Sequence, residues 1–198
     1  MIKSIRVIGL FLFAICILFT SCNNDLETDD YGVFSSQDDE TVIINGLIDS
    51  ELPTYWDNYI TAFPDTKRMI MRDCPGSTDD IANWEAAKMI HAQDITIHLP
   101  AEAIIASGVV DLFLSGTKRT RESGSQIGVH AWSDGNDNEA TDYPVGHEEH
   151  QGAIDYYVDI GFTQEEAEAF YYFTINAAPE ADIHWMTDDE IEQYKLLK

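Results

Sequence analysis

Three short motifs in the middle of the sequence carry the residue types that acyl-transfer chemistry uses. The first is the turn Pro75-Gly76-Ser77, the second is the pair Ser107-Gly108, and the third is His130. A serine hydroxyl attacks a carbonyl when a histidine takes its proton, and backbone amides can stabilise the oxyanion that forms. The motifs therefore predict a nucleophile, a general base and an anion-binding turn, provided that the fold brings them together.

Alternating strands and helices should position these motifs. Short apolar runs predict strands, and apolar residues at helical spacing predict helices at residues 52–63 and 81–91. The expected strands are residues 41–46, 69–71, 95–99 and 126–129. This rhythm favours an α/β domain with a mostly parallel sheet. Residues 103–116 are almost wholly apolar, so we expect a buried helix with Ser107 and Gly108 near its start.

The turn before the second helix has its own local chemistry. Pro75 fixes one backbone angle, Gly76 permits a close turn, and Ser77 with Asp80 fits a capping box that would start the helix. Amides at a helix start can bind an anion. Turns of this kind before helices are also common as purely structural features.

Taken in order, the motifs resemble the Clp protease proteolytic subunit and its crotonase-like relatives, in particular a secreted, ATP-independent branch. The matching segments are residues 73–77 (Asp-Cys-Pro-Gly-Ser), 106–108 (Ala-Ser-Gly), 112–116 (Leu-Phe-Leu-Ser-Gly), 127–130 (Ile-Gly-Val-His) and 185–190 (Trp-Met-Thr-Asp-Asp-Glu). The resemblance spans residues 42–197. It implies repeated β-β-α units with a mostly parallel sheet flanked by helices.

The resemblance also implies roles for single residues. Ser107 matches the nucleophile and His130 the general base, while the amides of Gly108 and Ser77 match the oxyanion hole. Ser77 stands where the family usually has glycine, and a serine there would be strained if the position needed a positive φ.

The third, orienting acid has no clear match. The family's order places it shortly before Trp185, where Asp182 is our candidate and Glu180 the alternative. Asp111 is unexpected in an apolar helix, and it could line the site or join a buried network.

Two other readings of the chemistry are weaker. His147 and His150 have a spacing that can hold a metal, but they lie in a segment rich in Gly, Asp and Asn, so we expect a solvated loop and no metal. Cys74 could act as a nucleophile with His130, although a buried structural thiol is the better interpretation. No cofactor is expected.

The first 21 residues have the pattern of a signal segment. Lys3 and Arg6 precede an uncharged run at residues 7–20, which is short for a spanning helix of about 20 apolar residues. The run ends at Phe-Thr-Ser-Cys22, which resembles the lipobox of bacterial lipoproteins. The resemblance implies cleavage before Cys22 and acylation of this cysteine, and two or three acyl chains anchor a protein stably to a membrane. An uncleaved anchor or ordinary secretion is the alternative.

Residues 22–40 are acidic and have few apolar residues, so they predict a disordered tether ahead of a folded domain at 41–198. The formal net charge of the chain is −25, which argues against nucleic acid and against direct binding to anionic lipid head groups. Because Cys16 would leave with the signal and Cys22 would be acylated, Cys74 has no partner for an intramolecular disulfide.

The sequence leaves three functions open. The first is a lipid-anchored serine hydrolase of the bacterial cell envelope, a peptidase that acts on peptide or other acyl substrates on the periplasmic or surface face of the outer membrane. The second is a catalytically impaired, ClpP-like binding or scaffold lipoprotein, which the serine at position 77 and the unassigned acid favour. The third is an acyl-thioester enzyme, because crotonase relatives use the same oxyanion geometry. A homo-oligomer, common in this superfamily, is compatible with all three.

Overall fold

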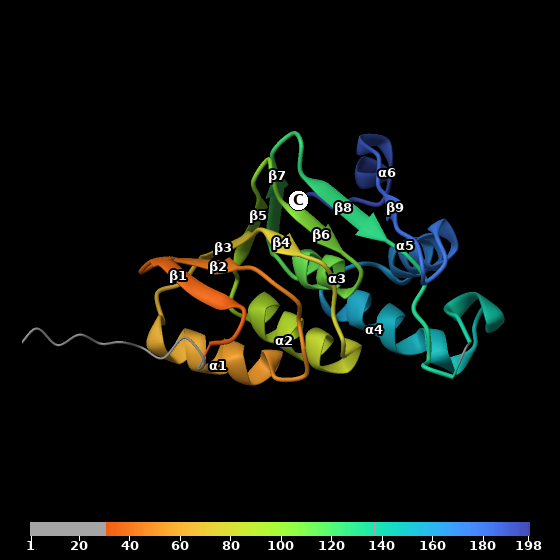
Figure 1. Cartoon of the computed structure of the whole chain (residues 1–198), viewed down its shortest axis with the longest axis horizontal. Helices are drawn as coiled ribbons and strands as arrows, with labels where there is room; N and C mark the ends of the chain where they lie inside the picture. Colours follow the sequence, from red (N-terminus) through yellow and green to blue (C-terminus); the bar gives the residue numbers. More distant parts are fainter. Residues whose placement is uncertain (1–30, 137) are drawn as a thin grey trace, which may run out of the picture.

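Two β-sheets with helices packed around them make up the computed structural model, which describes residues 31–136 and 138–198 (Figure 1). The five-stranded sheet has the order β1 (Phe34–Asp38), β2 (Thr41–Ile44), β3 (Arg68–Met71), β5 (Thr96–Leu99) and β7 (Lys118–Arg121). The four-stranded sheet has the order β4 (Asp73–Cys74), β6 (Ile104–Ala106), β8 (Gln126–Val129) and β9 (His184–Trp185). Of the strand pairs in these two sheets, as far as the structure describes the chain, β1–β2 and β8–β9 are antiparallel and the others are parallel. The expected α/β fold with mostly parallel sheets is confirmed.

The chain builds these sheets from a repeated β-β-α unit. The units are β3-β4 with α2 (Asp80–Ala92), β5-β6 with α3 (Gly108–Leu114), and β7-β8 with α4 (Gln151–Asp159). In each unit the first strand joins the five-stranded sheet and the second joins the four-stranded sheet. The segments that follow β4, β6 and β8 therefore leave the same edge of one sheet, because the carboxyl ends of parallel strands lie together.

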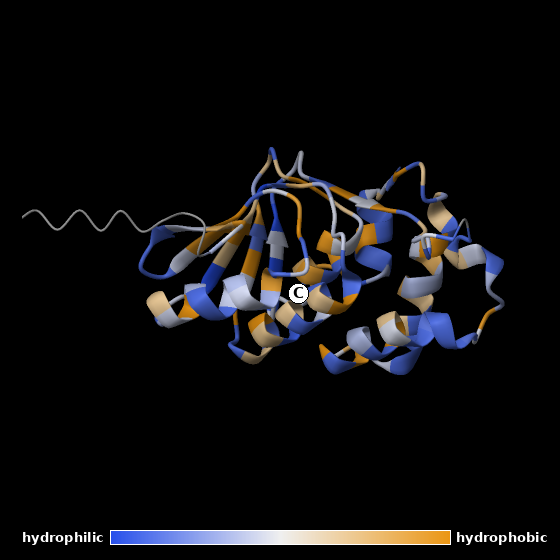
Figure 2. Cartoon of the chain, turned by 60° about the horizontal axis from the view of Figure 1, so that its bottom comes forward, coloured by the Kyte–Doolittle hydropathy of each residue, from blue (hydrophilic) through white to orange (hydrophobic). Residues whose placement is uncertain are grey.

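The remaining helices cover the sheets. They are α1 (Leu52–Ala62), α5 (Gln164–Ala177) and α6 (Asp188–Gln193), and α5 begins with the capping box between Thr163 and Glu166 that its sequence indicates. Figure 2 shows apolar residues concentrated in the strands and polar residues along the outer helices and loops. Six of the seven residues of α3 are buried, so α3 lies in the core where its apolar sequence predicts.

Three local predictions were wrong. Residues 34–38 form strand β1, paired with β2 and anchored by the buried ring of Phe34, so order begins ahead of Thr41 within the segment expected to be a tether. Residues 103–116 are not one helix, because Ile104–Ala106 pair as a strand between β4 and β8 before α3 starts. The N-cap of α2 is Asp79, whose carboxylate accepts from the amide of Ala82 at 3.1 Å, and not Ser77.

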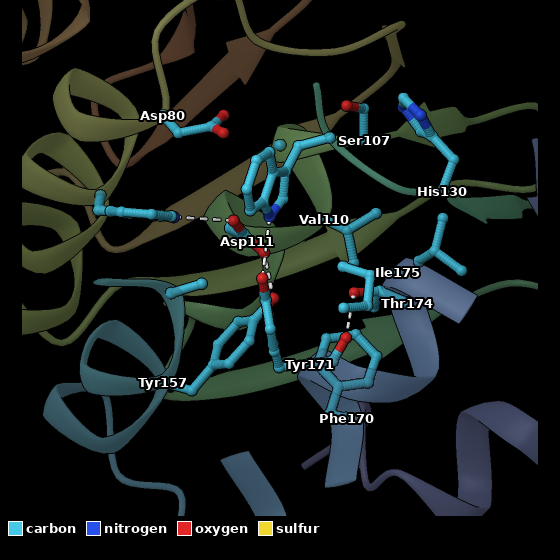
Figure 3. Close-up of a pocket in the computed structure, with 15 residues that line it drawn as sticks. Asp80, Ser107, Val110, Asp111, His130, Tyr157, Phe170, Tyr171, Thr174 and Ile175 are labelled. Atoms are coloured by element: carbon cyan, nitrogen blue, oxygen red, sulfur yellow. Dashed lines mark hydrogen bonds between the residues drawn. The ribbon is translucent and has the colours of Figure 1, made fainter. Parts of the chain in front are cut away.

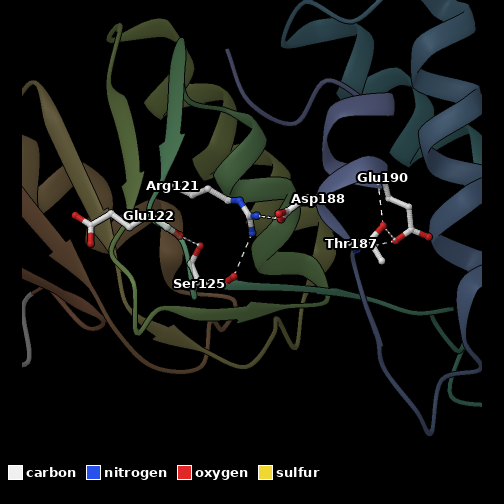
Figure 4. A network of polar contacts seen from close by, with 6 residues as sticks. All are labelled: Arg121, Glu122, Ser125, Thr187, Asp188 and Glu190. Atoms are coloured by element: carbon white, nitrogen blue, oxygen red, sulfur yellow. Dashed lines mark hydrogen bonds and ion pairs between the residues drawn. The ribbon is translucent and has the colours of Figure 1, made fainter.

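The side chain of Arg121 connects the C-terminal segment to strand β7. Arg121 on β7 forms an ion pair with Asp188 at the start of α6 and donates to the carbonyl oxygen of Ser125 at 3.2 Å (Figure 4). Thr187 and Glu190 form the capping box of α6, as the family-like motif at residues 185–190 implies.

Among the described residues, no helix is both long and apolar enough to span a bilayer. The predicted signal segment and the predicted acylation site at Cys22 lie outside the described residues.

Candidate active site

Neighbouring parallel strands deliver the predicted catalytic motifs to one edge of the four-stranded sheet. The register pairs Cys74 with Ile105 between β4 and β6, and Ala106 with Gly128 between β6 and β8. The residues just beyond these pairs are the turn with Ser77, then Ser107, then His130. The structure thus brings together three motifs that are separated in the sequence.

Ser107 occupies a strained backbone conformation between β6 and α3. Its φ is 57° and its ψ is −140°, a combination that residues other than glycine rarely adopt. The bond from its amide to the carbonyl oxygen of Gly128 (3.0 Å) and the tightly packed start of α3 hold it there. A serine on a sharp strand-to-helix turn exposes its hydroxyl at the sheet edge, which is the placement of a nucleophile in many hydrolases.

The residues predicted to form the oxyanion hole lie next to each other. A Cβ atom built on Gly108 would be 2.7 Å from the Cβ of Ser77, and one built on Gly76 would be 3.3 Å from the Cβ of Ser107. Gly108 therefore has no room for a side chain. Among the described residues, the N–H groups of Ser77 and Gly108 donate no hydrogen bond to backbone or side chain. Ser77 is not among the residues with positive φ, so a serine fits this position without strain.

Ser107 and His130 line one pocket, with a cavity of about 60 Å³, to which helices α4 and α5 also contribute side chains (Figure 3). In this view Ser107 lies between His130 and Asp80. No hydrogen bond joins Ser107 to His130, and the Nδ1 atom of His130 is buried without a partner among the described residues. A rotation of the Ser107 side chain is therefore needed before His130 can take its proton, a change that substrate binding commonly brings about.

Asp182, predicted as the third member of the triad, does not meet His130. Asp182 is exposed in the loop between α5 and β9, where its carboxylate accepts from the amide of Ile183 at 2.8 Å. The alternative, Glu180, is exposed in the same loop, and its amide donates to the side chain of Glu139. Neither acid lines the pocket.

Asp111 lines the pocket and also joins a buried network, so both roles considered for it apply. One carboxylate oxygen accepts from the hydroxyl of Tyr157 at 2.6 Å and the other from the indole N–H of Trp84 at 2.8 Å. The loss of water around Asp111 raises the pKa of its carboxyl to about 7, although both hydrogen bonds act in the opposite direction.

Asp80 is a pocket residue whose position the sequence did not reveal. A Cβ atom on Gly108 would lie 3.2 Å from its Oδ1, so this carboxyl faces the start of α3 next to Ser107. Burial raises the pKa of Asp80, and the negative charge of Asp79 adds to the effect, while His130 lowers it. In the sequence Asp80 has only the ordinary pattern of an acid in the first turn of a helix.

The other candidate residues have structural surroundings. His150 is buried, with Nδ1 2.7 Å from the hydroxyl of Tyr171, and His147 accepts from the amide of Glu149. Within residues 31–136 and 138–198 no three His, Cys, Asp or Glu side chains form a group suited to a metal. The Cys74 thiol is buried and burial raises its pKa to about 11, which fits its interpretation as a structural residue.

The repeated β-β-α units and the two mostly parallel sheets define an α/β fold that ClpP-like serine proteases also have. The structure is similar to two mutants of a membrane-bound stomatin-specific protease, 1510-N. The mutant with a substrate peptide bound is 21% identical, with a TM-score of 0.51 over 79% of this chain and 71% of that one. The other is 20% identical, with a TM-score of 0.51 over 79% and 75%.

A mutant of ClpP1 from Listeria monocytogenes is also similar, at 16% identity and a TM-score of 0.50, over 81% of this chain and 90% of that one. At these identities the likeness shows the fold. No protein-family model and no curated protein matches the sequence.

Proposed function

We propose that this protein is a serine hydrolase of the bacterial cell envelope that cleaves peptides by acyl transfer. The observation that carries the proposal is the strained Ser107, which lies at the sheet edge and lines the same pocket as His130. Next to it are Ser77 and Gly108, whose backbone N–H groups donate no hydrogen bond among the described residues. The fold that this chain shares with a substrate-binding protease supports a peptide as the acyl donor.

In the proposed reaction Ser107 Oγ attacks the carbonyl carbon of the substrate while His130 takes the hydroxyl proton. The amides of Ser77 and Gly108 hold the oxyanion. The amine then leaves with the proton from His130, and an acyl ester remains on Ser107. Water, deprotonated by His130, attacks this ester, releases the acid and restores the serine hydroxyl. Asp182 is not needed for these steps, because a Ser-His pair retains part of the rate of a triad.

A fluorophosphonate probe, which reacts with activated serines, tests the proposal. Wild-type protein should be labelled, Ser107→Ala should not, and Ser35→Ala, which changes an exposed serine on β1, should be labelled like wild type. Equal labelling of wild type and Ser107→Ala would contradict the role of Ser107.

We further propose that the chain is cleaved before Cys22 and anchored through acyl chains on this cysteine. The membrane-bound character of the similar protease fits such a location. Cells grown with an alkynyl fatty acid should yield labelled wild-type protein and unlabelled Cys22→Ser protein. Label retained by Cys22→Ser would rule out this anchor.

A catalytically impaired binding lipoprotein is the second candidate function. The unpartnered Nδ1 of His130 and the exposed position of Asp182 favour it, because no acid orients the imidazole. In that case the protein would bind peptides in the same pocket, would fold normally and would react with no fluorophosphonate.

A further inference from the structure

One buried side chain connects the two halves of the proposed oxyanion hole. Ser77 belongs to the turn before α2, whereas Gly108 is the first residue of α3. Asn83 lies one turn into α2, where its amide donates to the carbonyl oxygen of Asp79 at 3.0 Å. Its side-chain Nδ2 donates to the carbonyl oxygen of Gly108 at 2.6 Å. Asn83 thus links α2, the helix that follows Ser77, to Gly108, the residue that carries the second proposed oxyanion donor.

The packing around this bond leaves little freedom. A Cβ atom on Gly108 would lie 2.7 Å from the Cβ of Ser77 and 3.3 Å from Nδ2 of Asn83, so Gly108 packs closely against both residues. Asn83 has an exposed fraction of 0%. A hydrogen bond between buried groups is shielded from competing water, so the Gly108 carbonyl has a fixed direction.

Packing alone does not explain an asparagine at this position. Asparagine is a weaker helix former than alanine or leucine, and the other buried positions of α2 are Ala82, Ala86, Ala87 and Ile90. The Oδ1 atom of Asn83 is buried without a partner among the described residues, which lowers stability. The bond to Gly108 is the one feature of this site that an apolar residue could not supply.

We infer that Asn83 is a positioning residue. By holding the carbonyl oxygen of Gly108, which belongs to the peptide group after this residue, it fixes the Gly108 backbone at the start of α3, and through that backbone it directs the Gly108 N–H to the same oxyanion as the Ser77 N–H. Asn83 does not line the pocket, so it acts through Gly108 and does not touch substrate. Because the two amides are oxyanion donors only in the proposed reaction, this role rests on the proposed function.

Two labelling reactions at position 107 test the inference. When Ser107 attacks the phosphorus of a fluorophosphonate and displaces fluoride, a phosphoryl oxygen enters the oxyanion hole. Alkylation of Ser107→Cys by iodoacetamide forms no oxyanion and reports how accessible and reactive the thiolate at this position is. Asn83→Ala should lower the rate of fluorophosphonate labelling by about 10- to 100-fold. Removal of one oxyanion donor lowers the rate of an enzyme by about 10²–10³-fold, and here the Gly108 N–H is displaced rather than removed. The same substitution in the Ser107→Cys protein should change alkylation less than about twofold, because access is unaltered.

Ser115→Ala is the matched control. Ser115 is equally buried, and its hydroxyl donates to the carbonyl oxygen of Leu112 at 2.7 Å, at the other end of α3. Its removal should leave both labelling rates near those of wild type. Asn83→Asp keeps the shape of Asn83 but replaces the donor with an acceptor, and should slow fluorophosphonate labelling at least as much as Asn83→Ala. If circular dichroism shows that these variants do not fold, Asn83→Ser, which keeps a donor, should fold and give an intermediate rate.

The outcomes separate the two proposals. If the probe labels wild type, and labels the folded Asn83 variants at the same rate, the inference about Asn83 is overturned but the proposed function is not. An equal fall in labelling and alkylation would also overturn it, because local unfolding affects both. Wild type that the probe does not label would overturn the proposed function, and the role of Asn83 with it.

Discussion

Ser107 donates its backbone N–H to the carbonyl oxygen of Gly128 over 3.0 Å, and this bond joins the proposed nucleophile to β8, the strand just before His130. Because β6 and β8 are parallel, the residues that follow this bond on each strand leave the sheet on the same side. The relative position of Ser107 and His130 is therefore a property of the sheet, whereas the direction of the Ser107 hydroxyl depends on the rotation of one side chain.

Removal of the proposed general base should nearly abolish activity. His130→Ala should lower the rate of peptide or ester hydrolysis by about 10²–10⁴-fold, the usual contribution of a positioned base. His98→Ala is the control, because His98 bonds to Thr120 and lies outside the pocket. Steady-state kinetics on both variants check this. An active His130→Ala protein would contradict the mechanism.

The exposed position of Asp182 predicts that it contributes little to the reaction. Asp182→Asn should retain activity within about twofold of wild type, since its carboxylate accepts from Ile183 and not from His130. Measurement of kcat and KM decides the question. A fall of more than about 100-fold would instead show that Asp182 reaches His130 during the reaction, as the family resemblance implies.

The amide of Ser77, rather than its hydroxyl, should matter for catalysis. Ser77→Ala and Ser77→Gly keep the backbone N–H group, so their kcat should stay within about threefold of the wild-type value. Ser77→Pro has no N–H group at this position, so its kcat should fall by about 10²–10³-fold. Circular dichroism of Ser77→Pro controls for misfolding. A folded, fully active Ser77→Pro protein would exclude this amide from the oxyanion hole.

The carboxyl of Asp111 should make the free energy of unfolding depend on pH. Its pKa is raised from 3.8 to about 7 by burial, so the folded state binds more protons than the unfolded state between these values. The contribution of Asp111 to stability is therefore greatest below about pH 4, falls as the pH rises to about 7 and is constant above that. Each unit of pKa difference corresponds to about 1.4 kcal/mol.

Urea denaturation at several pH values measures this effect. Asp111→Asn should lose less stability than wild type between about pH 4 and pH 7, because the neutral side chain does not ionise. Asp155→Asn, on the exposed side of α4, should follow the wild-type curve. Parallel curves for wild type and Asp111→Asn would show that Asp111 titrates normally.

Arg119 should be among the residues most important for stability. Arg119 is 4% exposed, and its guanidinium donates to the carbonyl oxygens of Leu114, Gly116, Lys195 and Leu196. Arg119→Ala leaves these acceptors without the donor and should lower the free energy of unfolding by about 3–5 kcal/mol. Arg119→Lys should recover only part of this, because an ammonium lacks the planar fork. Thermal or urea denaturation, with the exposed Arg68→Ala as control, tests the prediction.

Much of the framework could be predicted from the sequence, because its signals are local. Apolar periodicity predicted α1 and α2 to within one residue at either end. The segment 103–116 was misread, because an apolar run of that length fits a buried helix as well as a short buried strand followed by a helix. Strand β1 was missed because four of its five residues are exposed, so its order comes from pairing with β2 and from Phe34.

Motif order in the sequence singled out Ser107, Gly108, Ser77 and His130, because each belongs to a short segment with recognisable neighbours. Only the tertiary structure could place Asp80, Asn83 and the pocket residues of α4 and α5 near these four residues. They come from separate helices, and no local sequence pattern indicates that they belong to the site. Likewise, the strain at Ser107, the unstrained backbone of Ser77 and the position of Asp182 outside the pocket lining depend on how the strands pair and the loops fold. The local sequence thus determined which residues could do the chemistry, and long-range packing decided which of them meet.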